Sequence, residues 1–245
     1  MSSVRFLGHS TLLLDLDGTD VITDPILRSR IPGLIHRHPL RDHSLVEAVQ
    51  CVLISHAHHD HLDLPSLRRL PRDAQVLGPL GSASLLRRNH PDVREMRPFE
   101  SHHVGNVHIV ATLAKHLGYR PPYGPFASIG FVLEGSLRIY FAGDTAVFPE
   151  MRDLGSIDLA LLPVSGWGPV VTPGHMWPRQ AVDALHLIQP SAAIPIHWGS
   201  LVPIGFHVRD WSYLHRPPHE FAEIARRELP DVAVTILEPG DTLEL

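Results

Sequence analysis

The order of strand-like and helix-like segments in the sequence predicts an α/β protein built as a four-layer αββα sandwich. Two observations support this prediction. Groups of strand segments are followed by a helix and a further strand in both halves of the chain, so each half can supply a sheet with helices on one face. The 245 residues contain no linker or low-complexity segment, so we expect a single domain over residues 1–245, with both sheets packed on one core.

The first half of the chain is expected to consist mainly of strands. Asp17 and Gly18 stand between two apolar segments and are typical of a hairpin turn. Cys51–Ser55 is a short apolar run that ends in polar residues, as buried strands do. The predicted elements are strands at Val4–Leu7, Ser10–Leu16, Asp20–Thr23 and Cys51–Ser55, and short helices at Leu64–Leu70 and Ser82–Asn89.

The second half is expected to combine strands with two longer helices. Pro178–Gln189 has a proline in its first turn and its apolar residues on one face, both of which are typical of a helix that covers a core. Pro217–Glu228 has the same one-sided pattern. The predicted strands are Val107–Thr112, Ile129–Leu133, Leu137–Ala142, Leu159–Val164, Ala192–Ile196 and Val232–Ile236.

Composition and charge exclude several classes of function. The formal net charge is -5, so the chain lacks the basic character of a protein that coats nucleic acid. No apolar run approaches the roughly 18 residues of a membrane span, and the first residues lack the apolar core of a signal peptide. The single cysteine, Cys51, excludes an internal disulfide and suits a reducing compartment. We expect a cytoplasmic protein with no nucleic-acid partner and no membrane span. The sequence does not decide between a monomer and a homo-oligomer.

Histidine is the residue that points to chemistry, because the chain has 19 of them and histidine is the commonest metal ligand. Residues 55–61, with the sequence SHAHHDH, directly follow the Cys51–Ser55 strand. A catalytic zinc site typically uses three protein ligands and a water, so four potential ligands on one loop argue for two metal ions. A solvated polar loop is the alternative. The four potential ligands are His56, His58, Asp60 and His61.

Three further potential ligands each follow a predicted strand, namely His116, Asp144 and His197. Strand ends that gather at one edge of a sandwich would bring them to a common point. A carboxylate is the natural bridge between two cations, so Asp144 is the bridging candidate. The alternatives are a turn aspartate at 144 and a packed histidine at 197. Nitrogen and oxygen donors make zinc the first expectation, and manganese or iron also fit. The histidines that compete with His116 for its role lie before or inside the strand and are His102, His103 and His108.

This ligand series resembles that of the metallo-β-lactamase fold superfamily, over about residues 8–199. Five short motifs are similar to one branch, which contains ascorbate-6-phosphate lactonases and the N-acylphosphatidylethanolamine-hydrolysing phospholipase D. The motifs are Gly8-His-Ser-Thr, Ile22-Thr-Asp-Pro, Leu53-Ile-Ser-His, Phe141-Ala-Gly-Asp-Thr and Ile196-His-Trp-Gly. The resemblance implies the αββα fold, which the strand pattern alone only permits.

The resemblance also implies a role for each candidate residue. His56, His58 and His116 would hold one metal ion. The other ion would be held by Asp60, His61 and His197, with Asp144 between the two ions. Asp24 would fix a ligand or the loop through hydrogen bonds, and His175 would lie near the substrate.

Several of these residues also have simpler interpretations. His175 could cap the helix that follows it, and Asp24 could be a turn residue before a proline. Among the remaining histidines, we expect His59 to point away from the site and His186 to pack in the core. His9 follows the first strand and could approach the site, but we interpret it as structural.

Three segments are expected to form the walls of a substrate pocket. Arg28–His43 is rich in arginine and histidine, so it could attract an anion, although a solvated basic loop is an equal alternative. Leu117–Phe126 and Gly205–His219 place aromatic residues just after proposed ligands. The aromatic residues are Tyr119, Tyr123, Phe126, Phe206, Trp211 and Tyr213, and Arg120 lies among those of the first segment.

The sequence therefore predicts a dinuclear metal-dependent hydrolase acting on a small anionic ester such as a phosphodiester or a lactone. Two cations about 3.5–4 Å apart can share a hydroxide near neutral pH, and this hydroxide would attack the ester. Asp60 would orient the hydroxide, and His175 would hydrogen-bond or protonate the departing group. The alternatives are a nuclease, which would need a basic track, a mononuclear iron redox enzyme, which would leave ligands unused, and a metal-stabilised binding protein without catalysis. A β-lactam hydrolase is disfavoured because the chain lacks an export signal.

Overall fold

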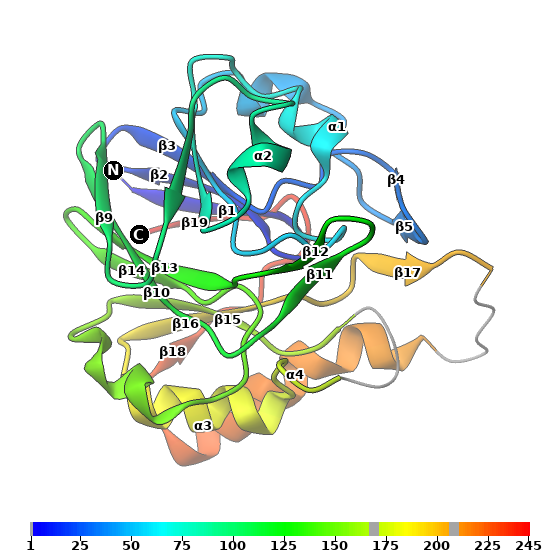
Figure 1. Cartoon of the computed structure of the whole chain (residues 1–245). Coiled ribbons are helices and arrows are strands. Elements are labelled where there is room, and N and C mark those ends of the chain that lie inside the picture. The colour runs from blue at the N-terminus through cyan, green and yellow to red at the C-terminus, as the bar shows by residue number, and fades with distance from the viewer. Residues whose placement is uncertain (1, 167–171, 206–210) are drawn as a thin grey trace.

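The fold is built on two seven-stranded sheets that pack face to face (Figure 1). It is seen in a computed structural model that describes residues 2–166, 172–205 and 211–245. The strands of the first sheet are β1 (Ser3–Gly8), β2 (Thr11–Leu16), β3 (Thr19–Thr23), β6 (Cys51–Leu53), β7 (Gln75–Pro79), β8 (Val93–Met96) and β19 (Thr242–Glu244). Their spatial order is β19-β1-β2-β3-β6-β7-β8.

The second sheet has the order β18-β16-β15-β14-β13-β10-β9. Its strands are β9 (Ser101–Val104), β10 (Val107–Leu113), β13 (Ile129–Glu134), β14 (Arg138–Phe141), β15 (Leu159–Pro163), β16 (Ala192–Ile196) and β18 (Ala233–Val234). In each sheet the strands of one half, out to the edge, run parallel, β3-β6-β7-β8 in one and β14-β15-β16-β18 in the other. The carboxyl ends of parallel strands share one edge, which is where ligands bind in open α/β sheets.

Helices cover both outer faces and complete the four layers. Figure 1 shows α1 (Leu64–Leu67) and α2 (Ala83–Leu86) on one side of the sheets, and α3 (Pro178–Ile188) and α4 (Ser212–Glu228) on the other. Two short 3-10 helices are η1 (His43–Val46) and η2 (Pro149–Leu154). The predicted αββα sandwich is therefore confirmed. No helix within the described residues is both long enough and apolar enough to cross a membrane.

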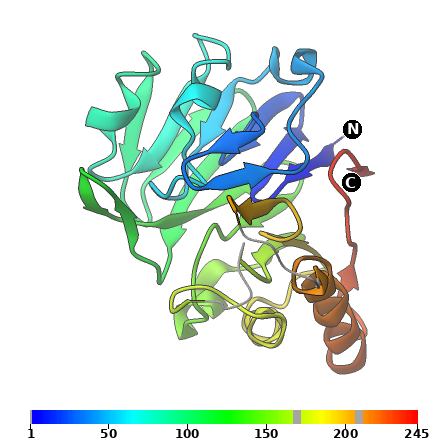
Figure 2. The ribbon, with the colours of Figure 1, turned by 90° about the vertical axis from the view of Figure 1, so that its right-hand side faces the viewer.

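The core follows from the alternation of side chains along each strand. Leu53 of β6 lies in the large apolar cluster between the sheets, whereas its neighbour Val52 belongs to the cluster under α1 and α2. On the far side, Leu185 of α3 and Phe221 of α4 join the large cluster and are fully buried. Figure 2 shows both chain ends close together, as the antiparallel pairing of β1 with β19 requires.

Two small sheets project from this sandwich. One pairs β11 (Gly118–Arg120) with β12 (Gly124–Phe126), and the other has the order β17-β5-β4, with β4 at Arg30–Ile31, β5 at Leu34–His36 and β17 at Leu201–Pro203. Both contain parts of the segments that we predicted as pocket walls. The predicted wall segments are therefore partly built from paired strands.

Element boundaries differ from the sequence prediction in a few places. Helix α4 begins at Ser212, before the predicted start at Pro217, because Leu214 is fully buried and extends the inward face by one turn. The last predicted strand is reduced to Ala233–Val234. His186 is exposed and lies beside Glu228 at 3.4 Å, so its prediction as a core residue was wrong.

Candidate metal centre

The loop after β6 places the predicted cluster inside the protein. His56 and His61 are fully buried, Asp60 is buried and His58 is half-buried. The loop is compact because the amides of His61 and Leu62 both donate to the carbonyl of His58. The solvated-loop alternative is therefore excluded for this segment.

The three later candidates reach the same place from the second sheet. His116 follows β10, Asp144 follows β14 and His197 follows β16, and the last two strands run parallel with β15 between them. Asp144 and His197 are buried, and His116 is half-buried. The packing of the two sheets thus brings together seven residues that lie far apart in the sequence.

Two groups of donor atoms can be distinguished at this edge. In the first group, the Nδ1 atom of His58 lies 2.9 Å from Nε2 of His56 and 3.1 Å from Nε2 of His116. Asp144 completes this group, whose ligand atoms all lie within 4.8 Å of one another.

The second group contains Asp60, His61, His197 and, in addition, His9. The Nε2 atoms of His61 and His197 are 3.1 Å apart, and Oδ2 of Asp60 lies 3.7 Å and 3.8 Å from them. Nε2 of His9 lies 3.2 Å from the same carboxylate oxygen. Both groups have the composition that the sequence predicted, apart from the extra histidine.

Asp144 lies between the two groups. Its Oδ2 atom is 3.6 Å from Nε2 of His56 and 3.1 Å from Nε2 of His61, and its Oδ1 atom is 3.2 Å from Nε2 of His197. Neither oxygen has a hydrogen-bond partner of acceptable geometry among the described residues, although both are buried. A buried carboxylate without such partners is costly, and a cation on each side would satisfy it.

The outer nitrogens of the histidines explain why the inner ones face each other. His61 donates from Nδ1 to Asp24 at 2.7 Å, and His197 donates from Nδ1 to the carbonyl of Ser165 at 2.7 Å. His116 donates likewise to the carbonyl of Gly174 at 3.0 Å. With Nδ1 donating outward, the neutral form of each ring carries its lone pair on Nε2 and can present it to a metal ion. The donor set fits divalent metal ions on this ground.

The charges of the cluster favour bound positive charge. Burial alone would raise the pKa of Asp144, but His197 and His61 hold it well below its usual range. Burial likewise opposes a low pKa at Asp60, and His61 and His9 outweigh it. His56 has a pKa well below its usual value because of its burial and the neighbouring His61, so it is an unprotonated donor, the form that a metal requires.

The backbone at this edge is unusual in two respects. His9, Asp24 and His197 all have positive φ angles, which aspartate and histidine adopt more readily than most residues. Gly143 also has a positive φ of 59, and a Cβ atom there would lie 2.6 Å from Cβ of Ser55. Glycine at this position therefore lets the Asp144 loop approach the loop that begins at Ser55.

The two predicted accessory residues also lie at the site. Asp24 is fully buried and accepts hydrogen bonds from the amide and hydroxyl of Ser55 at 2.7 and 2.6 Å, in addition to the bond from His61. His175 places Nε2 3.2 Å from Oδ2 of Asp144 and keeps part of its side chain exposed, while its Nδ1 lies 3.0 Å from the Thr172 carbonyl. Burial opposes a raised pKa at His175, but Asp144 raises it above its usual value.

Sequence reasoning missed the roles of two residues at the site. His9 was interpreted as structural, yet it follows strand β1 just as the other candidates follow theirs, and this signal was available. Arg120 is buried and donates from Nη1 to the carbonyls of Ala57 and Leu62, at 3.0 and 2.7 Å. It joins both ends of the ligand loop, and no local pattern in the sequence indicated this contact.

The other histidines considered for the site have different partners. His102 lies 2.8 Å from the amide oxygen of Gln75, and His108 lies 2.8 Å from Glu134. His103 stacks on His108 with 4.4 Å between the ring centroids. His116 is therefore the histidine of this region that the structure brings to the centre.

The three predicted wall segments contribute unequally. Arg28 is neutralised by two hydrogen bonds to Asp63, at 2.8 and 2.7 Å, so it is not a free anion-binding group. Tyr119, Tyr123 and Trp211 are exposed. Phe206 lies outside the described residues.

The family model and the curated relatives that match this chain agree on one family. The family model described as "Beta-lactamase superfamily domain" matches residues 19–198, which include every candidate ligand except His9. A protein of Opitutus terrae named UPF0173 metal-dependent hydrolase is 33% identical over 99% of this chain and 99% of its own length.

Solved structures show the same fold. Igni18, described as a novel metallo hydrolase from the archaeon Ignicoccus hospitalis, has a TM-score of 0.75 at 23% identity and covers 100% of this chain and 99% of its own. CmlA, a diiron β-hydroxylase from Streptomyces venezuelae, has a TM-score of 0.77 at 20% identity, over 100% of this chain and 54% of its own.

Proposed function

Because the chain belongs to the metallo-β-lactamase superfamily and is a metal-dependent hydrolase, we propose that it holds two divalent metal ions and hydrolyses a small anionic ester such as a phosphodiester or a lactone. The observation that supports two ions is the position of Asp144, whose carboxylate contacts histidines of both donor groups. A site for one ion would leave the other group of buried donors without a partner.

The residues that would hold each ion follow from the two groups. His56, His58 and His116 would hold one ion, and the other would be held by Asp60, His61 and His197, with Asp144 shared. Zinc is the first expectation for these nitrogen and oxygen donors, and manganese or iron also fit. When bound, such ions make water a nucleophile near neutral pH and polarise the oxygen on which charge develops.

Side chains of the chain would then position the reactants. Asp60 accepts from His9 through Oδ2, and this bond would fix the carboxylate that holds the ion and orients the attacking water. Nε2 of His175 lies beside Asp144 at the part of the centre that is still accessible. It can therefore donate a proton or a hydrogen bond to the departing group.

The preference for an anion follows from the charge of the filled site. Asp24, Asp60 and Asp144 are the carboxylates of the centre, and two divalent cations would outweigh their combined charge by one before a bound water loses its proton. This residual positive charge lies in a buried environment, where it acts more strongly than in water.

A turnover panel tests the proposal. Purified protein loaded with zinc, manganese or iron would be assayed with phosphodiesters, lactones and carboxylic thioesters. We expect turnover of at least one phosphodiester or lactone, lost in Asp60→Asn but retained in the surface variant Asp183→Asn. No turnover across the panel by fully loaded protein would contradict the proposal.

A redox enzyme is the second candidate, because the same donors accept iron and a diiron β-hydroxylase has the same fold. Dioxygen consumption by iron-loaded protein distinguishes the two candidates. A nuclease is disfavoured by the net charge of -5. Single-stranded and double-stranded nucleic acid in the same panel tests this alternative.

A further inference from the structure

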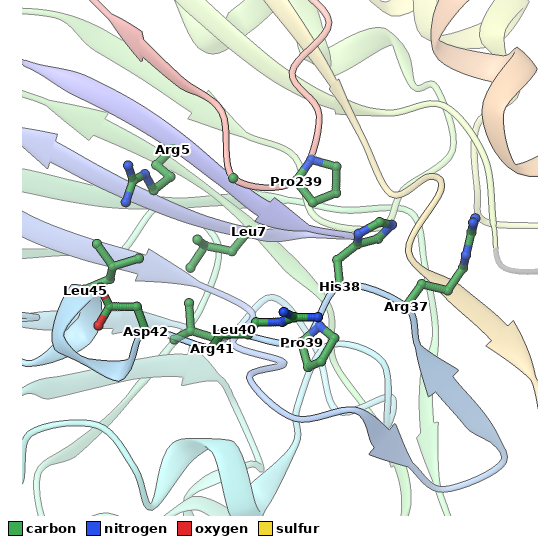
Figure 3. Close-up of a pocket in the computed structure, with 11 residues that line it drawn as sticks. Arg5, Leu7, Arg37, His38, Pro39, Leu40, Arg41, Asp42, Leu45 and Pro239 are labelled. Carbon is green, nitrogen blue, oxygen red and sulfur yellow. The ribbon is translucent and has the colours of Figure 1, made fainter.

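A cavity lies away from the metal centre, on the face of the first sheet that is turned away from the core between the two sheets. Side chains alternate along β1, so Phe6 enters the core between the sheets while Arg5 and Leu7 face the other way. There they meet the segment 37–45 and the chain near Pro239, around a cavity of about 380 Å³ (Figure 3). No residue of the two donor groups lines it.

The lining combines positive charge with an apolar floor. Figure 3 shows Arg5 and Asp42 at one end and His38 and Arg37 at the other, with Leu7 between them. Further apolar lining comes from Pro39, Leu40, Leu45 and Pro239. The volume is within the range of small-molecule sites, about 300–1,000 Å³.

The arginines of this cavity are not neutralised by carboxylates. The lining contains Arg5, Arg37 and Arg41 and a single carboxylate, Asp42. Within the described ranges, none of these three guanidinium groups lies in an ion pair, whereas Arg28, outside the cavity, pairs with Asp63. The cavity is therefore locally positive in a chain whose net charge is -5.

Arg37 donates from Nη1 to the carbonyl of Gly199 at 3.3 Å and lies 2.9 Å from Nε2 of His215, so Arg5 and Arg41 are the arginines available to a ligand. Asp42 accepts from the amide and the hydroxyl of Ser44 at 3.1 and 2.6 Å, so its Oδ1 atom is occupied by the start of η1. Arg5 donates from Nε to Thr242 at 2.8 Å, which orients its guanidinium group, and its terminal nitrogens have no hydrogen bond to the described residues. Arg41 has no hydrogen-bond partner among the described side chains and backbone.

We propose that this cavity is a second binding site, for a small organic anion with a phosphate-like head and an apolar body. Arg5 and Arg41 would bind the head through charge-assisted hydrogen bonds, the strongest kind available to an exposed group. Leu7 and Leu40 would contact the body. This site is independent of the reaction at the metal centre.

Calorimetric titration of the metal-loaded protein with phenylphosphonate tests the proposal, because its carbon–phosphorus bond is not an ester. The metal centre also offers an anion site, and competitive inhibition of ester hydrolysis by phenylphosphonate reports that site separately. Arg5→Gln and Arg41→Gln remove one charge each, and Arg88→Gln is the control, since Arg88 is exposed and lies outside this cavity. Thermal unfolding verifies that all variants are folded.

We expect the titration to reveal one class of phenylphosphonate sites. Arg5→Gln and Arg41→Gln should each lower the affinity of this class by about tenfold, the loss typical of one charge-assisted hydrogen bond. Arg88→Gln should leave it unchanged, and all three variants should keep the inhibition constant and kcat of the wild type. Inorganic phosphate should bind this class more weakly than phenylphosphonate. A change of less than twofold in both cavity variants would overturn the proposal, and equal affinity for inorganic phosphate would overturn the apolar part of it.

Discussion

Replacing Asp24 by asparagine tests how the buried hydrogen bonds behind the metal centre support it. Asp24 accepts three hydrogen bonds, from the amide of Ser55, from the hydroxyl of Ser55 and from Nδ1 of His61. Asparagine retains one accepting oxygen but presents an NH₂ group to the other donors. Depending on its orientation, the Asp24→Asn side chain presents a donor either to the Ser55 amide or to His61 and the Ser55 hydroxyl, where an acceptor is needed.

The expected loss falls on metal affinity. Replacing the outer partner of a metal-ligating histidine typically weakens metal binding about 10–100-fold, or roughly 1.4–2.7 kcal/mol. The ion held by His61 should be affected most. The ion held by His56 should be affected less, because Ser55 lies between Asp24 and that histidine, with its Oγ atom 3.0 Å from Nδ1 of His56.

Competition with a chromophoric chelator measures both affinities. Ser55→Ala is the matched variant, because it removes the link to His56 and leaves the bond between Asp24 and His61 in place. Ser55→Ala should weaken mainly the binding of the ion held by His56. Unchanged affinity for both ions in Asp24→Asn, with an unchanged melting temperature, would refute this role of Asp24.

Three further predictions concern stability, pH and catalysis. Arg120→Met removes both hydrogen bonds to the carbonyls of Ala57 and Leu62. The unfolding free energy should fall by about 3 kcal/mol and Tm by roughly 6–12 °C. A fall in calorimetric Tm of less than about 2 °C would contradict the stabilising role of these hydrogen bonds. Burial lowers the pKa of His36 from 6.5 to about 4, so the folded state resists its protonation and stability is lost as pH falls from about 6.5 to about 4. This contribution is about 3 kcal/mol, so in denaturant titrations the loss over this pH range should be smaller by about this amount in His36→Phe than in the wild type. His175→Ala should lower kcat by about 10²–10⁴-fold at unchanged metal content, and a parallel loss of metal would instead make His175 a ligand.

The fold could be predicted from the sequence where periodicity is strong. Helix α3 was predicted within one residue, since a proline starts it and its buried face is regular. Strands β7 and β8 were missed, because β7 ends in Gly78-Pro79 and β8 contains Arg94 and Glu95. These strands are specified by parallel pairing with β6 and with each other, and pairing partners cannot be identified from a local pattern.

The candidate site could be predicted because its donors are types that seldom gather without a metal, each placed just after a strand. His9 fits the same rule and was overlooked because it stands alone after the first strand. Arg120 could not have been predicted, since an arginine between tyrosines and prolines suggests a loop. Its role depends on the β11–β12 hairpin folding back onto the carbonyls of the ligand loop.

The number of metal ions per chain tests the central claim most directly. Protein saturated with zinc, manganese or iron and freed of excess metal would be analysed by inductively coupled plasma mass spectrometry, with protein concentration from amino-acid analysis. We predict two ions per chain in the wild type and fewer in Asp144→Ala, whose carboxylate contacts both donor groups. One ion or none in the saturated wild type would contradict the dinuclear centre.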